Sequence, residues 1–191
     1  MTAFAHLSAA ALADARPLFA IEAESVADVA AREALLDAAM GLGRTRKSSE
    51  AIRRGRLPAR GLAFVARGLA GEVVGTVRLW DVCAGDGRAA LLLGPLAVSS
   101  AYEGVGIGSA LMRHALAEAA RLGHGAVLLV GDPAYYERFG FSSALSADLF
   151  MPGPFERHRL QGLELVPGSL SGAEGMIAPT GREAPAEGLA A

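Results

Sequence analysis

The sequence predicts an α/β fold in which a mixed β-sheet is flanked by helices. Strand-like and helix-like segments follow one another in the order β-α-α-β-β-β-α-β-α-β. Three successive strands interrupt the alternation, which argues against a regular parallel βαβ array. A chain of 191 residues is also long enough to bury one core as a single domain.

The first third of the chain supplies one strand and two helices. Residues 18–22 alternate weakly between apolar and polar residues and are expected to form a strand. A helix follows within 24–41, because its apolar residues recur at helical spacing and Gly41 provides a stop. A basic second helix is expected from about Ser48 to Arg54.

The middle of the chain supplies the strands of the sheet. Residues 61–68 and 72–85 are rich in β-branched and apolar residues, and the three residues between them predict a hairpin. Residues 89–98 form a continuous apolar strand, interrupted by Gly94 and Pro95.

The last elements are a long helix, a strand, a short helix and a final strand. The helix is expected over 108–122, with Gly123 after its end, and its buried face should comprise Leu111, Met112, Ala115, Leu116, Ala119 and Leu122. A buried strand at 126–130, a short helix started by Pro133 and a strand at 160–166 complete the pattern. We therefore expect an N-terminal extension over 1–17, a domain over 18–175 and a flexible C-terminal tail over 176–191.

Composition excludes several classes of function. The net charge of −2 gives no electrostatic case for binding nucleic acid, and no apolar run is long enough for a membrane span. Cys83 is the only cysteine, so no internal disulfide can form, and a cytoplasmic location is expected.

Three glycines stand where a strand gives way to the long helix. Gly104, Gly106 and Gly108 would let backbone N–H groups approach an anion, with the helix dipole behind them. A nucleotide-hydrolysing loop would need a lysine before Ser109, and a dinucleotide fingerprint would need a glycine in its place. The remaining possibilities are a different phosphate-bearing ligand, or glycines that merely make a turn.

Two motifs resemble those of the GNAT superfamily of N-acetyltransferases. Residues 103–108, Glu-Gly-Val-Gly-Ile-Gly, are similar to its acetyl-CoA motif, Q/R-x-x-G-x-G/A. Residues 128–141, LLVGDPAYYERFGF, resemble its second signature, a strand followed by a short helix that carries a tyrosine and then Gly-Phe. The resemblance covers about residues 18–175 and extends to a bacterial branch of predicted acetyltransferases.

The resemblance implies a mostly antiparallel central sheet and acetyl-CoA as cosubstrate. Strand four would separate from strand five at Gly94-Pro95 and form a cofactor cleft. The backbone of Leu96, Ala97 and Val98 would bind the pantetheine arm, and the Leu96 N–H would lie near the acetyl oxygen. Backbone N–H groups would receive the pyrophosphate along the loop of Glu103, Gly104, Val105, Gly106, Ile107, Gly108 and Ser109.

The resemblance also assigns side chains. Tyr136 occupies the position of the general acid, and a phenol of reference pKa about 10 is protonated at neutral pH; the alternative is an aromatic ring that packs the pocket wall. Asp132 stands where many relatives have an asparagine that contacts the cofactor. No metal is expected.

Several features leave the mechanism open. Glu103 and Val105 replace residues that donate hydrogen bonds in the family, so cofactor affinity is in doubt. The general base is unresolved among Glu22, Glu24, Asp81 and His124, or water. Arg44, Arg46 and Lys47 precede the second helix, a region that often lines the acceptor side in the family, and the alternative is a solvated surface.

We therefore expect an acetyl-CoA-dependent N-acetyltransferase that moves the acetyl group directly to a primary amine. The alternative is a non-catalytic acyl-CoA-binding regulatory module. The expected partners are acetyl-CoA and an amine acceptor, with no nucleic acid and no membrane, in a monomer or homodimer. The acceptor itself is chosen by loops and helix surfaces that carry no portable motif.

Overall fold

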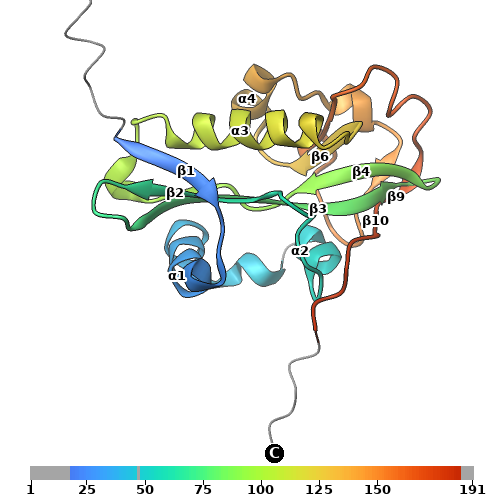
Figure 1. Cartoon of the computed structure of the whole chain (residues 1–191). Coiled ribbons are helices and arrows are strands. Elements are labelled where there is room, and N and C mark those ends of the chain that lie inside the picture. Colours follow the sequence, from blue (N-terminus) through green and yellow to red (C-terminus); the bar gives the residue numbers. More distant parts are fainter. Residues whose placement is uncertain (1–17, 47, 186–191) are drawn as a thin grey trace, which may run out of the picture.

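A computed structural model describes residues 18–46 and 48–185. A central β-sheet separates two layers of helices: α1 and α2 cover one face, and α3 and α4 lie on the other (Figure 1). The strands of the large sheet lie in the order β1-β2-β3-β4-β6-β8, with β5 and β10 also paired to β3. The expected N-terminal extension, Lys47 and residues 186–191 lie outside the described residues.

The N-terminal elements match their sequence signals. The edge strand β1 (Phe19–Ala23) is followed by a 3-10 turn and α1 (Val29–Met40). The carboxylate of Asp28 accepts hydrogen bonds from both the backbone N–H and the hydroxyl of Ser25, at 2.8 Å each, which fixes the entry to this turn. Gly41 ends α1 with φ +73°, a value that favours glycine, and α2 (Ser48–Arg53) follows.

The predicted hairpin is confirmed as β2 (Ala63–Gly68) and β3 (Val73–Ala84), which pair in antiparallel register. β3 has twelve residues and pairs with four other strands. Its first half pairs with β2 on one edge and β5 on the other, and its second half pairs with β10 and β4.

The strand expected over 89–98 is broken into two pieces at Gly94 and Pro95. β4 (Arg88–Leu93) and β5 (Ala97–Val98) both pair with β3, so they follow one another along the same edge of it. The parallel ladder between β4 and β6 (Ala126–Val130) comprises the pairs Leu91–Val127 and Leu92–Leu128. The other ladders recorded in the large sheet are antiparallel, which confirms a mostly antiparallel sheet.

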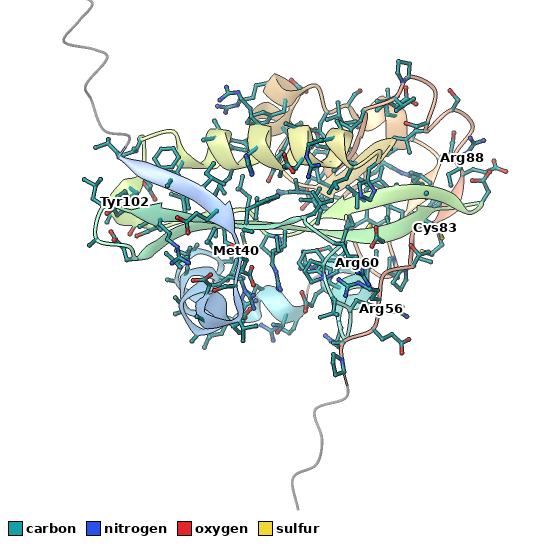
Figure 2. All side chains as sticks on the ribbon, in the orientation of Figure 1. Met40, Arg56, Arg60, Cys83, Arg88 and Tyr102 are labelled. Carbon is teal, nitrogen blue, oxygen red and sulfur yellow. The ribbon has the colours of Figure 1, made fainter. Side chains whose placement is uncertain are left out.

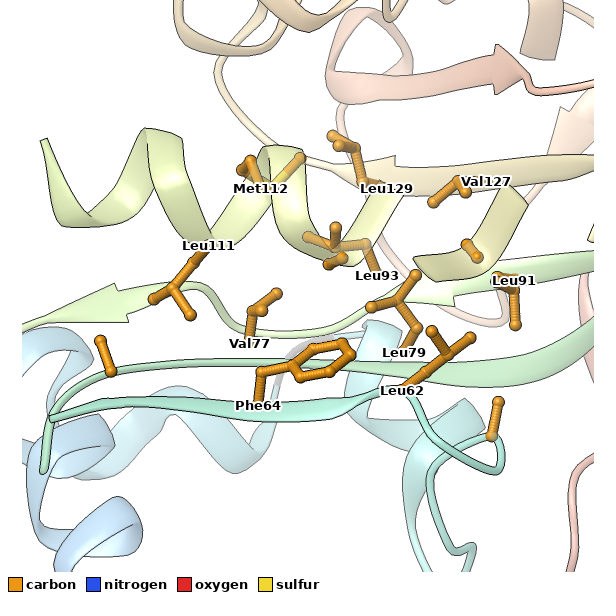
Figure 3. Close-up of a cluster of buried hydrophobic side chains, with 14 of the residues drawn as sticks. Leu62, Phe64, Val77, Leu79, Leu91, Leu93, Leu111, Met112, Val127 and Leu129 are labelled. Atoms are coloured by element: carbon orange, nitrogen blue, oxygen red, sulfur yellow. The ribbon is translucent and has the colours of Figure 1, made fainter. Parts of the chain in front are cut away.

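The long helix α3 (Ile107–Arg121) packs its apolar stripe on the sheet. Leu111 and Met112 point toward Val77, Leu93 and Leu129 in the main core (Figure 3). One expected core residue is wrong: Leu122 is 41% exposed, because the helix has ended and Gly123 turns the chain away with φ +84°.

The C-terminal third continues the sheet and then doubles back on it. The short helix α4 (Pro133–Tyr136) follows β6, and β8 (Leu160–Glu164) pairs with β6 at the edge of the sheet. The two-residue strands β7 (Leu149–Phe150) and β9 (Gly175–Met176) form a separate parallel pair.

The flexible tail expected from residue 176 is corrected for residues 176–185. β10 (Ala178–Pro179) pairs with Cys83 and Val82 of β3, and Ile177 is only 1% exposed. Arg56 after α2 also bridges to Glu183. This segment therefore covers the edge of β3 that β2 leaves free.

Candidate active site

The glycine loop presents backbone donors at the start of α3. Gly104 and Gly106 have φ values of +76° and +90°, so a side chain at either position would be strained. Gly106 is the N-cap of α3, and its carbonyl accepts the first hydrogen bond of the helix from the Ala110 N–H at 3.0 Å. The N–H groups of residues 107–109 therefore have no acceptor within the helix and are available to an anion.

Two other loop residues use their N–H groups within the loop itself. The Glu103 N–H donates to the Ser100 carbonyl at 3.3 Å, and the Val105 N–H donates to the Tyr102 carbonyl at 3.4 Å. The expected anion site therefore keeps its free N–H groups at residues 107–109, whereas the N–H groups of Glu103 and Val105 already have acceptors within the loop.

A cavity of about 340 Å³ opens over this loop. Its lining combines the glycines and Ser109 with Tyr135 and Arg138 from the segment after β6. A Cβ at Gly108 would lie 2.9 Å from the Tyr135 hydroxyl oxygen, so the absence of a side chain makes room for that tyrosine.

Arg138 is a residue that the sequence analysis missed. Its Nε donates to the Tyr135 carbonyl at 2.8 Å, and its guanidinium carbon lies 4.5 Å from the centre of the Tyr135 ring. These contacts hold a cation beside a cavity that the glycine loop lines. The signal in the sequence was its position three residues after Tyr135, because such a pair shares one face of a helical turn.

Among the described strands, β5 pairs with β3 on one edge and has no partner on the other. The Ser99 N–H donates to the Val74 carbonyl at 2.8 Å, and Ala97 pairs with Thr76. Because backbone hydrogen bonds alternate between the two edges of a strand, the groups of Leu96 and Val98 point to the other edge, away from β3. Ala97 thus directs its backbone to β3, and its buried side chain packs with Leu35 and Leu36 of α1.

A cavity of about 360 Å³ follows β5 and faces α1. It adjoins the loop cavity, with which it shares Val98 and Glu103. At its other end it shares Leu96 with a smaller cavity of about 90 Å³, lined also by Gly94, Pro95 and Tyr136. Leu96 and Tyr136, which are 40 positions apart in sequence, therefore meet at one cavity.

The break at Gly94 is shaped by a close packing contact. A Cβ at Gly94 would lie 2.2 Å from Cζ3 of Trp80, so only glycine lets this ring pack against the backbone. The Gly94 N–H still donates to the Arg78 carbonyl at 2.8 Å, which holds the end of β4 against β3. Pro95, which has no N–H to donate, follows directly and interrupts the pairing with β3.

Tyr136 is positioned by packing. A Cβ at Gly131 would lie 2.1 Å from Cε2 of Tyr136, and the ring makes edge-on contacts with Tyr135 and Phe141, at centroid distances of 4.9 and 6.0 Å. Burial, reinforced by the neighbouring Tyr135, raises the pKa of Tyr136 to about 12. The phenol is thus protonated well beyond neutral pH.

Asp132 is the N-cap residue of α4. Its carboxylate accepts a hydrogen bond from the Ala134 N–H at 3.1 Å and caps the helix, with Pro133 at the first helical position. Asp132 is exposed and lines none of the cavities described above.

The four candidate bases are not brought to the Tyr136 cavity. Glu22 pairs with Arg67 at 2.7 Å, and Glu24 is buried in ion pairs with Arg32 and Arg78. Asp81 and His124 do not line the Tyr136 cavity. They also do not line a neighbouring cavity, which lies next to it on the α2 side of the sheet.

Arg44, from the segment before α2, does line both of these cavities. It is ion-paired with Glu33 and Asp37 of α1. Met40, at the end of α1, and Arg56, after α2, lie on the same side of the sheet (Figure 2). The segment that the sequence analysis associated with the acceptor side therefore contributes a side chain to the cavity of Tyr136.

Comparison with known proteins decides the family. Residues 59–143 match the family model described as acetyltransferase (GNAT) domain. The N-acetyltransferase YhbS of Escherichia coli, named as uncharacterized, is 33% identical over 117 residues, which is 61% of this chain and 70% of the relative. The chain belongs to the GNAT family. YjhQ of the same organism, also named an uncharacterized N-acetyltransferase, is 33% identical over 88 residues, or 42% of this chain and 48% of that protein.

Solved GNAT structures have the same fold. The crystal structure of E. coli YhbS in complex with CoA superposes with a TM-score of 0.75 at 30% identity, over 87% of this chain and 92% of that one. A GNAT acetyltransferase from Brucella melitensis in complex with acetyl-CoA gives a TM-score of 0.64 at 26% identity, over 85% and 96% of the two chains. Within residues 18–46 and 48–185, this GNAT protein has no helix long and apolar enough to cross a membrane.

Proposed function

We propose that this GNAT protein transfers the acetyl group of acetyl-CoA directly to a primary amine. One observation carries the proposal: three adjoining cavities run from the glycine loop, along the open edge of β5, to Tyr136. That path suits a long cofactor with a diphosphate at one end and a reactive thioester at the other. The CoA and acetyl-CoA complexes of the YhbS and Brucella structures support the same choice.

The diphosphate would be held at the start of α3. The N–H groups of residues 107–109 have no intrahelical acceptor, and the helix dipole favours an anion there. Arg138, held against Tyr135, would supply the positive charge that Val105 does not. Glu103 adds a negative charge to the same lining, which makes Arg138 the more important for affinity.

The pantetheine arm would lie along β5. The backbone groups of Leu96 and Val98 on the open edge can hydrogen-bond to its amides as a neighbouring strand would. The expected separation of the chain after β4 from β6, beyond the pair Leu92–Leu128, is part of this proposal. It is supported by the pairing of β5 with β3 and by the cavity that Leu96 shares with Val130 of β6.

Bound acetyl-CoA would supply the thioester carbonyl that the amine attacks. The Leu96 N–H would donate to the carbonyl oxygen and stabilise the charge that develops there. The new C–N bond forms as the C–S bond breaks. An acceptor ammonium first loses one proton to water. The second proton, released when the C–N bond forms, balances the one that the departing sulfur gains.

Tyr136 would assist the departing sulfur mainly by hydrogen bonding. A phenol of pKa about 12 is a much weaker acid than a thiol of reference pKa about 8.5. Complete transfer of its proton to the thiolate would be uphill by roughly 5 kcal/mol. A hydrogen bond from Tyr136 to the sulfur, or a proton transfer coupled to uptake of the proton that leaves the amine, avoids this cost.

Thiol release tests the proposal. Purified protein would be incubated with acetyl-CoA and a broad panel of primary amines and peptides, with thiol release and the mass of the product followed together. Equal amounts of free CoA and N-acetylated product are expected. Micromolar binding of acetyl-CoA with no product from any acceptor would instead favour the acyl-CoA-binding regulatory module.

A further inference from the structure

Another cavity, of about 250 Å³, lies beside the Tyr136 cavity on the α2 side of the sheet. The two share Arg44, Arg53 and Pro95, so a small molecule could reach from one to the other. Arginines dominate the charged lining of this 250 Å³ cavity: they are Arg44, Arg53, Arg54, Arg56 and Arg78, against Glu33 and Glu50.

Two of these arginines are held in place by one aromatic ring. The guanidinium carbons of Arg53 and Arg78 lie 5.2 and 5.4 Å from the centre of the Trp80 ring. Trp80 is itself fixed, since its Nε1 donates to the Arg56 carbonyl at 3.2 Å and its ring packs on Gly94. Guanidinium groups fixed in this way are preorganised to bind an oxyanion.

Both arginines retain donors that the described residues do not use. Arg53 is almost fully buried, with 7% of its side chain exposed, yet its recorded hydrogen bond is the single one from Nη2 to Glu50, at 2.8 Å. Each guanidinium has five N–H groups. Nε of Arg78 lies 3.1 Å from Glu24 Oε2, but the two are misaligned and neither atom has a hydrogen-bond partner among the described residues.

The nearby carboxylates Glu24 and Glu33 already form ion pairs with arginines. Glu24 is shared between Arg32 and Arg78, and Glu33 between Arg32 and Arg44. Burial lowers the pKa of both Arg53 and Arg78, which means that their positive charges are poorly solvated. An incoming anion would supply acceptors for the unused N–H groups and add to the counter-charge that Glu50 and Glu24 already provide.

We propose that the amine acceptor carries an anionic group, a carboxylate or a phosphate monoester, bound by Arg53 and Arg78. This inference rests on the acetyl transfer proposed above and specifies the class of acceptor. The anion occupies the arginine-lined cavity, and the amine extends past Pro95 into the cavity of Tyr136 and Leu96. Neutral and doubly cationic amines leave the guanidinium donors unpaired.

Matched acceptors test the inference in the wild-type protein. 3-Aminopropanoate, propylamine and 1,3-diaminopropane differ only in the group at the far end, and 2-aminoethyl phosphate with ethanolamine makes the phosphate pair. We expect kcat/KM for the better anionic acceptor to exceed that of its neutral partner by about 10- to 150-fold, the range for hydrogen bonds to charged groups. Comparison of 3-aminopropanoate with 2-aminoethyl phosphate identifies whether the site prefers a carboxylate or a phosphate.

Substitutions then locate the anion. R53Q and R78Q should each remove most of the preference, by raising KM for the anionic acceptor much more than KM for its neutral partner. R121Q is the control, because Arg121 is an exposed arginine of α3 that pairs with Glu118. R53K and R78K should each retain part of the preference, since lysine keeps the charge without the planar fork of donors.

A binding measurement separates this inference from the proposed function. With CoA present, calorimetry compares N-acetyl-3-aminopropanoate and the phosphate product, O-phospho-N-acetylethanolamine, with neutral N-propylacetamide. Tighter binding of either anionic product supports the anion site even if no acceptor turns over, a result that would refute only the transferase. Equal binding of the neutral and anionic products, or equal turnover of the neutral and anionic acceptors, overturns the anion site but not the acetyl transfer. Failure of every acceptor and product to react or bind overturns both proposals.

Discussion

Replacing Tyr136 with phenylalanine removes one oxygen atom and little else. The ring contacts with Tyr135 and Phe141 and the close packing on Gly131 are made by ring atoms that phenylalanine retains. No hydrogen bond to the Tyr136 hydroxyl is recorded within the described residues, so the free energy of unfolding near neutral pH should change by less than about 1 kcal/mol.

The effect on turnover should be much larger. A hydrogen bond to a charged group contributes about 1.5–3 kcal/mol, which corresponds to roughly 10- to 150-fold in kcat if the bond forms only as charge develops on the sulfur. Steady-state thiol release gives kcat, and calorimetry gives the Kd for acetyl-CoA. We expect kcat to fall within this range and Kd to stay within a factor of two.

Tyr135→Phe is the matched control, because it removes the same atom from the adjacent residue. The Tyr135 hydroxyl faces Gly108 in the loop cavity, so this change should weaken binding of CoA and leave kcat nearly unchanged. Unchanged kcat in Tyr136→Phe, or weaker cofactor binding with the same kcat, would refute the assignment and leave Tyr136 as a wall of the pocket.

The raised pKa of Tyr136 also makes stability depend on pH. The unfolded phenol ionises near 10 and the folded one near 12, so the stability of the wild type is fully present below pH 10 and declines as the pH rises toward 12. At pH 11, the wild type should have lost about 1.4 kcal/mol relative to Tyr136→Phe. Urea unfolding of both proteins at pH 8 and pH 11 measures the difference, and a constant gap between them would contradict the assigned pKa.

Three further substitutions probe the site. Gly106→Val should weaken CoA binding more than tenfold. Gly123→Val imposes comparable backbone strain at the far end of α3 and should leave CoA binding intact. Equal affinity of the two variants for CoA in calorimetry would exclude the loop as the phosphate site. Arg138→Gln should raise the Kd for CoA by about 10-fold and reduce its salt dependence, and a Kd and salt dependence equal to those of the wild type would show that Arg138 does not bind the phosphates. Gly131→Ala should lower kcat by displacing the Tyr136 ring, and should have less effect in a Tyr136→Phe background; full additivity of the two losses would argue against this coupling.

Elements with strong local signals could be predicted from the sequence. The hairpin of β2 and β3, the end of β4 at Gly94-Pro95 and the start of α3 are each indicated by residues adjacent in the chain. Glycine conformation, β-branched runs and helical spacing report such features directly. The positive φ values of Gly104 and Gly106 are an example, because the loop needs them wherever the rest of the chain lies.

Features made by contacts between distant segments could not be predicted in this way. Trp80 and Arg78 lie on β3 and Arg53 lies on α2, so nothing in their spacing indicates that one ring holds both guanidinium groups. β10 was expected as a tail, because a two-residue strand is too short to show alternation, and its pairing with β3 depends on the free edge that β2 leaves.

The most direct test of the account is to follow the acetyl group itself. Acetyl-CoA labelled with carbon-13 in the acetyl group would be incubated with the protein and with 3-aminopropanoate, 2-aminoethyl phosphate and a broad panel of other amines and peptides, and the products analysed by mass spectrometry. The account predicts one labelled acetyl group on the acceptor nitrogen for each thiol released, with a rate that falls in Tyr136→Phe. Tight binding of acetyl-CoA without a labelled product from any acceptor would contradict it.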